Sequence, residues 1–202
     1  MGKLAVDVVL LPDEAMMQKV IAANKKLVEK FDSEIVLDKD GCLPHISLAM
    51  GVLEEGDVGT VEGILRSVAE QTSLGKLEAV GVRTSVNAKG QKVSVFEVKK
   101  TRQLQQLHEQ IMVRLASSFD HNVTSEMLYG AGEVAESTLT WIADYPDKAS
   151  FENFFPHITV GFGEAEGQGF PLEFSVSRLA LCQLGNHCTC RKVLVAVDMG
   201  RV

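Results

Sequence analysis

The chain has 202 residues, is 46% hydrophobic and carries a formal net charge of -7 at pH 7. This suffices to bury a sizeable core, in one domain or two closely packed lobes. The apolar runs are too short to cross a bilayer, and the N-terminus lacks the features of a signal peptide. We therefore expect a cytoplasmic protein with no membrane partner. The acidic balance, with no Lys/Arg cluster longer than a pair, disfavours a protein that coats long nucleic acids.

The first part of the chain alternates strands and helices. Residues 4–11 are apolar and β-branched, which predicts a largely buried strand. Pro12-Asp13-Glu14 then looks like the start of a helix that ends near Phe31, with an apolar stripe interrupted by Asn24. A short strand at 35–37, a turn at 38–41 and an extended segment at 45–53 complete this part.

The middle of the chain predicts two capped helices around a hairpin. Asp57 is placed to cap a helix whose inner face runs from Val61 to Val68. Strands follow at 77–86 and 92–98, joined by a turn at 87–90. Thr101 is placed to cap a third helix, which carries an apolar stripe to Leu115.

The sequence pattern predicts fewer elements in the last part of the chain, from residue 120 onward. For residues 120–155 we expect a loop with short helical pieces, one of them near 151–154. A strand at 157–162 and a Gly/Glu loop at 163–169 come next. Two strands, about 171–184 and 192–199, close the chain around a turn at Gly185-Asn186. The order of elements predicts an α+β fold with a hint of internal duplication.

The four cysteines leave two interpretations open. Cys182, Cys188 and Cys190 lie close together and next to His187, which could make a small zinc site or a set of reduced thiols. The one-residue gap between Cys188 and Cys190 is not the usual zinc spacing, and a fourth ligand is not evident. We therefore expect no metal, and in a cytosolic chain we expect no disulfide.

Two of the five histidines occur in the same five-residue motif. Pro44-His45-Ile46-Ser47-Leu48 and Pro156-His157-Ile158-Thr159-Val160 both read Pro-His-apolar-Ser/Thr-apolar. The chance that two histidines match this pattern by accident is on the order of one in 10^5 for such a composition. The repeat therefore indicates a shared function for His45 and His157.

The period of a strand explains what each motif offers. Residues i and i+2 point to one face, so His45 shares a face with Ser47, and His157 shares a face with Thr159. The isoleucine between them points the other way, into the core. If the two strands lie side by side about a pseudo-two-fold axis, one space receives two imidazoles and two hydroxyls.

Such a space suits the cleavage of a phosphodiester. One group must take a proton from the nucleophile, and another must give a proton to the leaving oxygen. An imidazole pair can do both near neutral pH, with one ring neutral and one protonated. The hydroxyls of Ser47 and Thr159 can donate hydrogen bonds to the non-bridging oxygens, where charge must be stabilised. The scheme requires no metal and no cofactor.

The two motifs, in this order and at this spacing, resemble those of the 2H phosphoesterase superfamily. This group includes the 2′-5′ RNA ligase-like proteins and the cyclic nucleotide phosphodiesterases. The resemblance implies that residues 1–202 form a single bilobal domain with pseudo-two-fold symmetry, in which antiparallel sheets line a central cleft and helices lie outside. It also implies metal-free opening of 2′,3′-cyclic phosphates, or chemistry at 2′-5′ links. His45, Ser47, His157 and Thr159 match the four motif residues of the family.

Two functions remain open at this point. The first is a hydrolase acting on an RNA terminus or a small cyclic nucleotide, and we expect it to be a monomer. The second is a module that binds a nucleotide or an RNA end in the same cleft without turning it over. Ligase-like bacterial members often carry an arginine soon after the second motif, where this chain has Val160-Gly161-Phe162-Gly163. The sequence therefore favours a phosphoesterase over a ligase.

Overall fold

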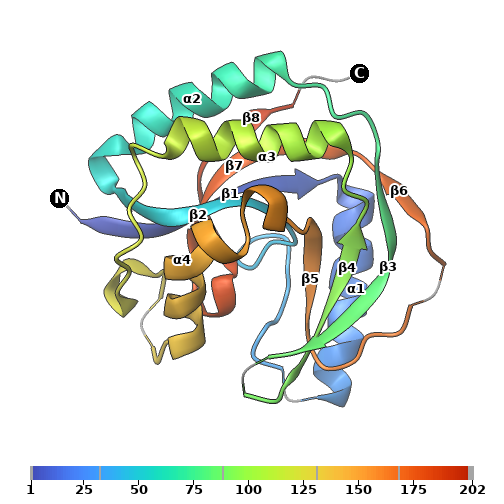
Figure 1. Ribbon diagram of the computed structural model, residues 1–202. Helices are drawn as coiled ribbons and strands as arrows, with labels where there is room; N and C mark the ends of the chain where they lie inside the picture. The colour runs from blue at the N-terminus through green and yellow to red at the C-terminus, as the bar shows by residue number, and fades with distance from the viewer. Residues whose placement is uncertain (1, 32, 88, 131, 168, 200–202) are drawn as a thin grey trace.

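The structure is a computed structural model that describes residues 2–31, 33–87, 89–130, 132–167 and 169–199. In these ranges eight strands form two antiparallel four-stranded sheets, and four α-helices lie on the outside (Figure 1). This arrangement confirms the expected α+β class and its paired antiparallel sheets. None of the helices in the same ranges has the length and apolar character needed to cross a membrane.

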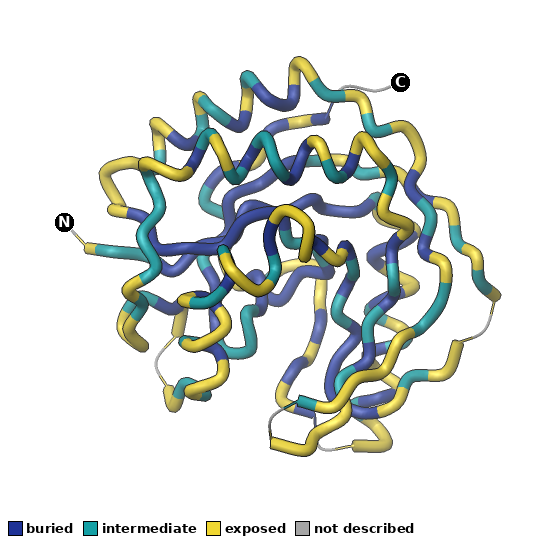
Figure 2. Tube along the Cα trace, in the orientation of Figure 1, coloured by how far each residue is buried: buried dark blue, intermediate teal, exposed yellow. Residues whose placement is uncertain are grey.

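The first sheet contains the N-terminal strand and the C-terminal hairpin. Its strand order is β2 (Ile46–Glu54), β1 (Lys3–Pro12), β7 (Val176–Leu184) and β8 (Cys190–Asp198). Helix α2 (Val58–Gln71) packs against β7 and β8. Helices α3 (Arg102–Leu115) and α4 (Glu136–Lys148) pack against β2. The central strand β1 is almost entirely buried, and the middle of β7 is buried beside it (Figure 2).

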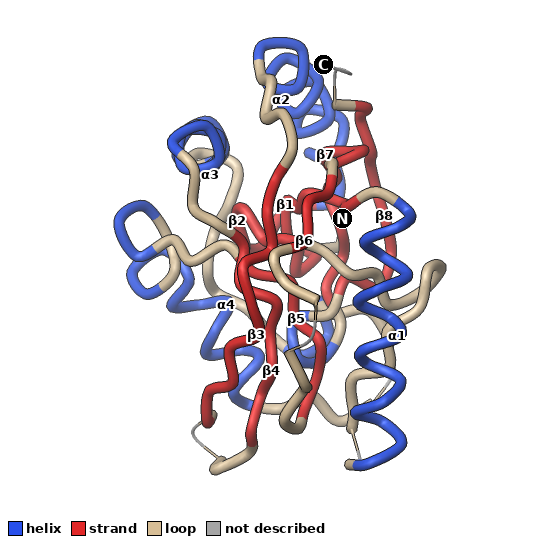
Figure 3. The backbone as a smooth tube through the Cα atoms, turned by 90° about the vertical axis from the view of Figure 1, so that its right-hand side faces the viewer, coloured by secondary structure: helices blue, strands red, loops and turns tan. Residues whose placement is uncertain are grey.

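The second sheet has the order β5 (His157–Phe162), β4 (Lys92–Val98), β3 (Leu77–Val86) and β6 (Leu172–Phe174). Helix α1 (Glu14–Lys30) packs against β5 and runs alongside this sheet (Figure 3). The two motif strands, β2 and β5, are edge strands of different sheets, and they contact each other. The two motifs therefore meet where the sheets meet.

The core uses the residues that alternate with the motif side chains. Ile46 and Ile158 are fully buried in the main hydrophobic cluster, as the strand period predicts. Leu48 and Val160, the next core-facing positions, are also fully buried there. Each motif strand is thus fixed by apolar packing on one face, which leaves its other face free for polar side chains.

Most predicted elements are confirmed. Apart from the strand at 35–37, the strands and helices expected before residue 116 match β1, α1, β2, α2, β3, β4 and α3, and the second motif strand matches β5. Thr101 caps α3, because its hydroxyl accepts a hydrogen bond of 3.2 Å from the Leu104 amide. Asp57 occupies the N-cap position of α2, but its side chain makes no capping bond, since a 3-10 turn (Glu55–Asp57) precedes the helix. The predicted turn at 87–90 includes Ala88, which lies outside the described residues.

The strand expected at 35–37 is wrong. This segment has no strand partner among the described residues, although Ile35 and Leu37 are buried. The Asn24 side chain of α1 takes the place of a neighbouring strand. It donates to the carbonyl oxygen of Ile35 at 2.8 Å and accepts from the amide of Leu37 at 2.8 Å. A single buried amide thus satisfies a backbone that the hydrophobic pattern assigns to a sheet.

The loop expected over residues 120–155 is wrong in its second half, where the helix α4 lies. Its apolar stripe is sparse, with Thr138, Ile142 and Tyr145 buried, and Pro146 lies inside the helix. Both features weaken the helical signal in the sequence. Short 3-10 turns at Ser125–Met127 and Phe151–Asn153 fit the short helical pieces that were expected.

The C-terminal region differs in two further ways. The long strand expected at 171–184 is divided between β6 and β7, because the chain leaves the second sheet after Phe174 and enters the first at Val176. The tight turn expected at 185–186 is a 3-10 turn, η4 (Asn186–Cys188). Contrary to our expectation of reduced thiols, Cys182 and Cys190 form a disulfide between β7 and β8, since antiparallel pairing brings their Cα atoms to 5.6 Å.

Candidate functional site

A cavity of about 630 Å³ lies between the two motif strands. All four predicted site residues, His45, Ser47, His157 and Thr159, line it. The first sheet and the segment before β2 supply one side, and β3, β4 and β5 supply the other. The structure therefore brings together the two motifs, although 112 positions (157 minus 45) separate the two histidines.

His45 lies directly before β2 and is nearly enclosed, with 11% of its side chain exposed. Its Nδ1 atom is 2.7 Å from the carbonyl oxygen of Leu43. A carbonyl only accepts hydrogen bonds, so Nδ1 carries the proton in the neutral ring. Nε2 is then the nitrogen that can accept a proton from a molecule in the cavity.

His157 repeats this arrangement at the start of β5. Its Nδ1 atom is 2.8 Å from the carbonyl oxygen of Phe155, again the residue two positions earlier. The ring also stacks on the Phe155 ring, with centroids 5.3 Å apart. Both imidazoles are thus held in the same tautomer by the same local contact, and both leave Nε2 as the reactive nitrogen.

The environment lowers the pKa of both imidazoles. Burial is the main cause that lowers the pKa of His45 to about 4; the bond to Leu43 opposes the shift, and a charge on nearby His157 adds to it. Burial also lowers the pKa of His157. Both rings are therefore neutral at pH 7, and a bound anion would raise their pKa values.

A row of residues across the second sheet adds a positive charge. In the strand register Thr159 of β5 pairs with Val95 of β4, and Val95 pairs with Arg83 of β3. All three line the cavity. The guanidinium carbon of Arg83 lies 4.9 Å from the centroid of the Phe155 ring, which orients the cation over the aromatic face.

Helix α4 forms a further side of the cavity. Ser137, Trp141, Tyr145 and Lys148 recur at steps of three or four residues, and all four line the cavity. Trp141, which is 41% exposed, is the single tryptophan of the chain. Trp141 and Phe155 are thus two exposed aromatic rings that line the same cavity as the histidine pair.

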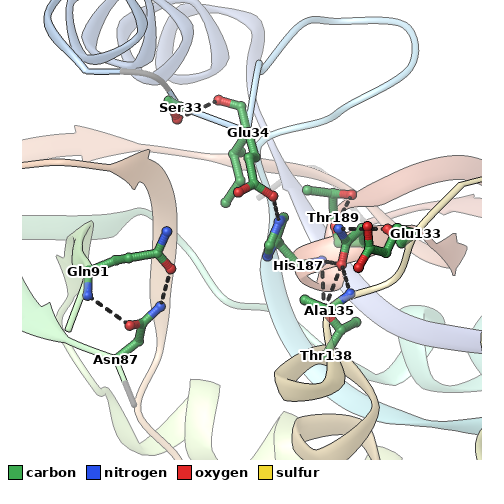
Figure 4. Close-up of polar contacts among 11 residues, drawn as sticks. Ser33, Glu34, Asn87, Gln91, Glu133, Ala135, Thr138, His187 and Thr189 are labelled. Carbon is green, nitrogen blue, oxygen red and sulfur yellow. Dashed lines mark hydrogen bonds and ion pairs between the residues drawn. The ribbon is translucent and has the colours of Figure 1, made fainter. Parts of the chain in front are cut away.

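A polar contact joins two segments across the cavity edge. Glu34, in the segment after α1, contacts Nε2 of His187 in η4 at 2.6 Å (Figure 4). The Asn186 side chain accepts hydrogen bonds from the Ala135 amide and the Thr138 hydroxyl, both at 3.0 Å, and so fixes η4 to the start of α4. The cavity is therefore bounded by segments that lie far apart in the sequence.

Sequence reasoning missed several of these residues. Arg83 and Trp141 carry no motif, and only the register of β3 and the presence of α4 bring them to the cavity. Asp7 did leave a signal, since it is the one charged residue in the apolar run 4–11. It is fully buried in β1, and its Oδ2 atom lies 3.9 Å from Nε2 of His45.

One further histidine and two phenylalanines pack next to the second motif. His108 of α3 is fully buried; it bonds to the Leu48 carbonyl at 2.7 Å and accepts from the Phe151 amide at 2.7 Å. Phe154 is buried and stacks on His108, whereas Phe155 is exposed, and both line the cavity. Within the described ranges, no three His, Cys, Asp or Glu side chains are grouped to hold a metal ion.

Solved structures share this architecture. TT0787 of Thermus thermophilus superposes with a TM-score of 0.64 at 15% identity, over 97% of this chain and 98% of that one. E. coli LigT in its apo form gives a TM-score of 0.55 at 14% identity, over 100% of both chains. The fold is LigT-like. No protein-family model matches the chain, and no curated protein matches its sequence. The similarity extends over the whole chain but concerns the fold alone, and the LigT-like arrangement expected from the motifs is confirmed at that level.

Proposed function

We propose that this LigT-like chain is a metal-independent phosphoesterase that opens 2′,3′-cyclic phosphates at RNA ends or on small nucleotides. The observation that carries the proposal is the matched pair of imidazoles. His45 and His157 have their Nδ1 atoms 2.7 and 2.8 Å from backbone carbonyls, and both line one cavity. Hydrolysis of a cyclic phosphodiester requires two proton-transfer groups that reach the same bound phosphate.

In this proposal the two imidazoles share the proton transfers. One Nε2 takes a proton from water as the water oxygen bonds to phosphorus. The other imidazole, protonated, gives its proton to the ribose oxygen as the phosphorus–oxygen bond breaks. The hydroxyls of Ser47 and Thr159 donate to the non-bridging oxygens, and Arg83 supplies a positive charge to the same cavity. The product is a phosphomonoester, and the scheme extends to 2′-5′ linkages by the same steps.

The dimensions of the cavity favour a nucleotide or a chain end. Its volume of about 630 Å³ lies within the range of sites for drug-sized molecules. Trp141 is partly exposed there and can stack on a base. The net charge of -7 argues against binding along an extended backbone.

The decisive test is turnover of 2′,3′-cyclic nucleotides and of an RNA oligomer with a 2′,3′-cyclic end, by wild type and by two single variants. Loss of a general acid or base costs about 10^2- to 10^4-fold in rate, so we expect losses of that size in His45→Ala and in His157→Ala. His121→Ala is the matched control, because His121 lies outside the cavity lining and should leave turnover unchanged.

Two outcomes would contradict the proposal. Unchanged turnover in both variants would exclude an acid-base role for the pair. Tight binding of the same nucleotides by wild type, with no turnover of any of them, would favour the second function, a module that holds a nucleotide or RNA end in this cavity.

A further inference from the structure

Asp7 is a buried carboxyl group that the scheme above does not use. It lies in β1, is 0% exposed, and has Oδ2 3.9 Å from Nε2 of His45. Among the described residues, no group meets the geometry of a hydrogen bond to either of its oxygens. The Ser47 hydroxyl and the amides of Leu48 and Ala49 lie close enough to lower the pKa of Asp7, but burial raises it by more. A buried polar group without a partner calls for a functional explanation.

The surroundings of Asp7 leave one basic neighbour. The titratable groups that face it are His45, Tyr145 of α4 and Cys188 of η4. Within the described ranges, no lysine or arginine nitrogen lies within 4 Å of its carboxyl oxygens. Tyr145 is buried and Cys188 is half-buried, and burial raises the pKa of both groups, which keeps both neutral. A proton on Asp7 can therefore pass to His45 and to no other base in contact.

We propose that Asp7 stores the proton that His45 delivers to the leaving oxygen, an inference that rests on the proposed phosphoesterase function. When phosphate enters the cavity, the Oδ2–H bond of Asp7 breaks and an Nε2–H bond of His45 forms, which leaves a carboxylate beside an imidazolium. The separation of 3.9 Å must shorten by about 1 Å for direct transfer. No other donor is consumed, and the carboxylate takes up a proton again after product release.

The charge of the substrate explains why the transfer waits for binding. Burial raises the pKa of Asp7 well above its usual value and lowers the pKa of His45 to about 4, so burial favours the neutral acid beside the neutral base. A phosphate group close to His45 favours the imidazolium by direct attraction. The anion thus moves the proton from the carboxyl to the ring that touches the substrate.

The same asymmetry assigns the two catalytic roles. His45 has a carboxyl group within 4 Å of its Nε2 atom, whereas no carboxylate among the described residues lies that close to His157. His45 is therefore the general acid for hydrolysis, and His157 is the general base. Asp7 acts through His45 and is a positioning and proton-storing residue rather than a group that touches the substrate.

The first test is the pH profile of Asp7→Asn. The amide matches the carboxyl in shape but cannot deliver a proton, so His45 must be charged from solvent at its own low pKa. We expect kcat at pH 7 to fall about 100-fold, with KM changed by less than about 3-fold, and much of the loss to be recovered as the pH is lowered to 5. Asp7→Val is measured in parallel, in case the new amide bonds to His45.

Folding is checked separately. Removing a buried carboxyl whose pKa is raised by burial should leave the melting temperature of Asp7→Asn at pH 7 unchanged or higher. Val8→Ala is the matched control on the same strand, since Val8 faces the main core instead of the cavity. It should lower the melting temperature but leave the shape of the pH profile intact.

The second test needs no turnover. Adenosine 2′-monophosphate is added to protein labelled with 13C at aspartate carboxyls and with 15N at histidine. We expect the Asp7 carbon to shift to its ionised position and the His45 nitrogens to shift to those of an imidazolium on binding. Binding without either shift would overturn the inference, as would the absence of binding.

The outcomes separate this inference from the proposed function. If wild type turns over substrate and both Asp7 variants keep its pH profile, the role of Asp7 is overturned and the proposed phosphoesterase function stands. Absence of wild-type turnover on every cyclic substrate overturns the phosphoesterase, and the NMR titration then decides whether proton transfer from Asp7 accompanies phosphate binding.

Discussion

Asn24 of α1 donates a hydrogen bond of 2.7 Å to the carbonyl oxygen of Val160 in β5. The same side chain bonds to Ile35 and Leu37, so one buried amide connects a helix, a motif strand and the segment that borders the cavity. Val160 directly follows Thr159. The position of the second motif strand therefore depends on a polar contact as well as on apolar packing.

The first prediction concerns this contact. Asn24→Ala removes three hydrogen bonds and leaves buried backbone groups unpaired, which should lower the free energy of unfolding by about 2–4 kcal/mol. Urea unfolding measures the loss. Lys25→Ala, at the next and exposed position of α1, should change stability by less than about 0.5 kcal/mol. Equal stability of Asn24→Ala and wild type would show that the amide does not hold β5.

The second prediction is a pH dependence of stability that belongs to His45. Its folded pKa is lowered to about 4, so below pH 6.5 the unfolded chain binds a proton that the folded chain does not. This contribution to the free energy of unfolding is present above pH 6.5 and is lost as the pH falls toward 4. At 1.36 kcal/mol per pKa unit, the total loss is about 3 kcal/mol. Asp7, whose pKa is raised, acts in the opposite direction.

A paired measurement isolates the His45 contribution. The unfolding free energies of wild type and His45→Gln are determined by urea titration at pH 7 and at pH 4. The difference between the two proteins should shift by about 3 kcal/mol against wild type on acidification. A difference that is constant with pH would mean that His45 is not buried as a neutral ring.

The third prediction separates the hydroxyl of Thr159 from its shape. Thr159→Val keeps the volume and removes the donor, and loss of one such donor to a developing charge costs about 10^2- to 10^3-fold in kcat. Thr159→Ser keeps the hydroxyl and should retain kcat within about 5-fold. Both are assayed on a 2′,3′-cyclic nucleotide. Equal activity of the two variants would remove Thr159 from phosphate binding.

The fourth prediction uses Trp141 as a reporter. It is the single tryptophan, and it lines the cavity with 41% of its surface exposed, so nucleotide binding should change the intrinsic fluorescence. Trp141→Ala should weaken nucleotide binding by about 1–3 kcal/mol if the ring stacks on the base, and Trp141→Phe should weaken it less. If both variants bind as wild type does, the base lies elsewhere in the cavity.

The sequence alone was enough to predict that the two motifs meet. The five-residue motif carries its own geometry, since a strand directs His45 and Ser47 to one face and the residue between them, Ile46, to the core. The duplication indicated that two such faces meet. Each of these inferences depends on local backbone periodicity, which the sequence contains directly.

The failures share one cause, which is that long-range contacts overrode local pattern. Residues 35–37 are apolar and read as a strand, yet their backbone bonds to Asn24. Helix α4 packs against β2 despite its internal Pro146, because Ile142 and Tyr145 are buried in a cluster with Met50 of β2. Neither partner is visible within the window of residues from which a local prediction is made.

The sequence by itself determined which functional groups the two motif strands present on one face, namely two imidazoles and two hydroxyls. Only the tertiary structure decided that Arg83 and Trp141 line the same cavity, that Cys182 bonds to Cys190, and that the carboxyl of Asp7 lies 3.9 Å from His45. Strand register and helix placement fix these distances, and both follow from packing of the whole chain rather than from any segment of it.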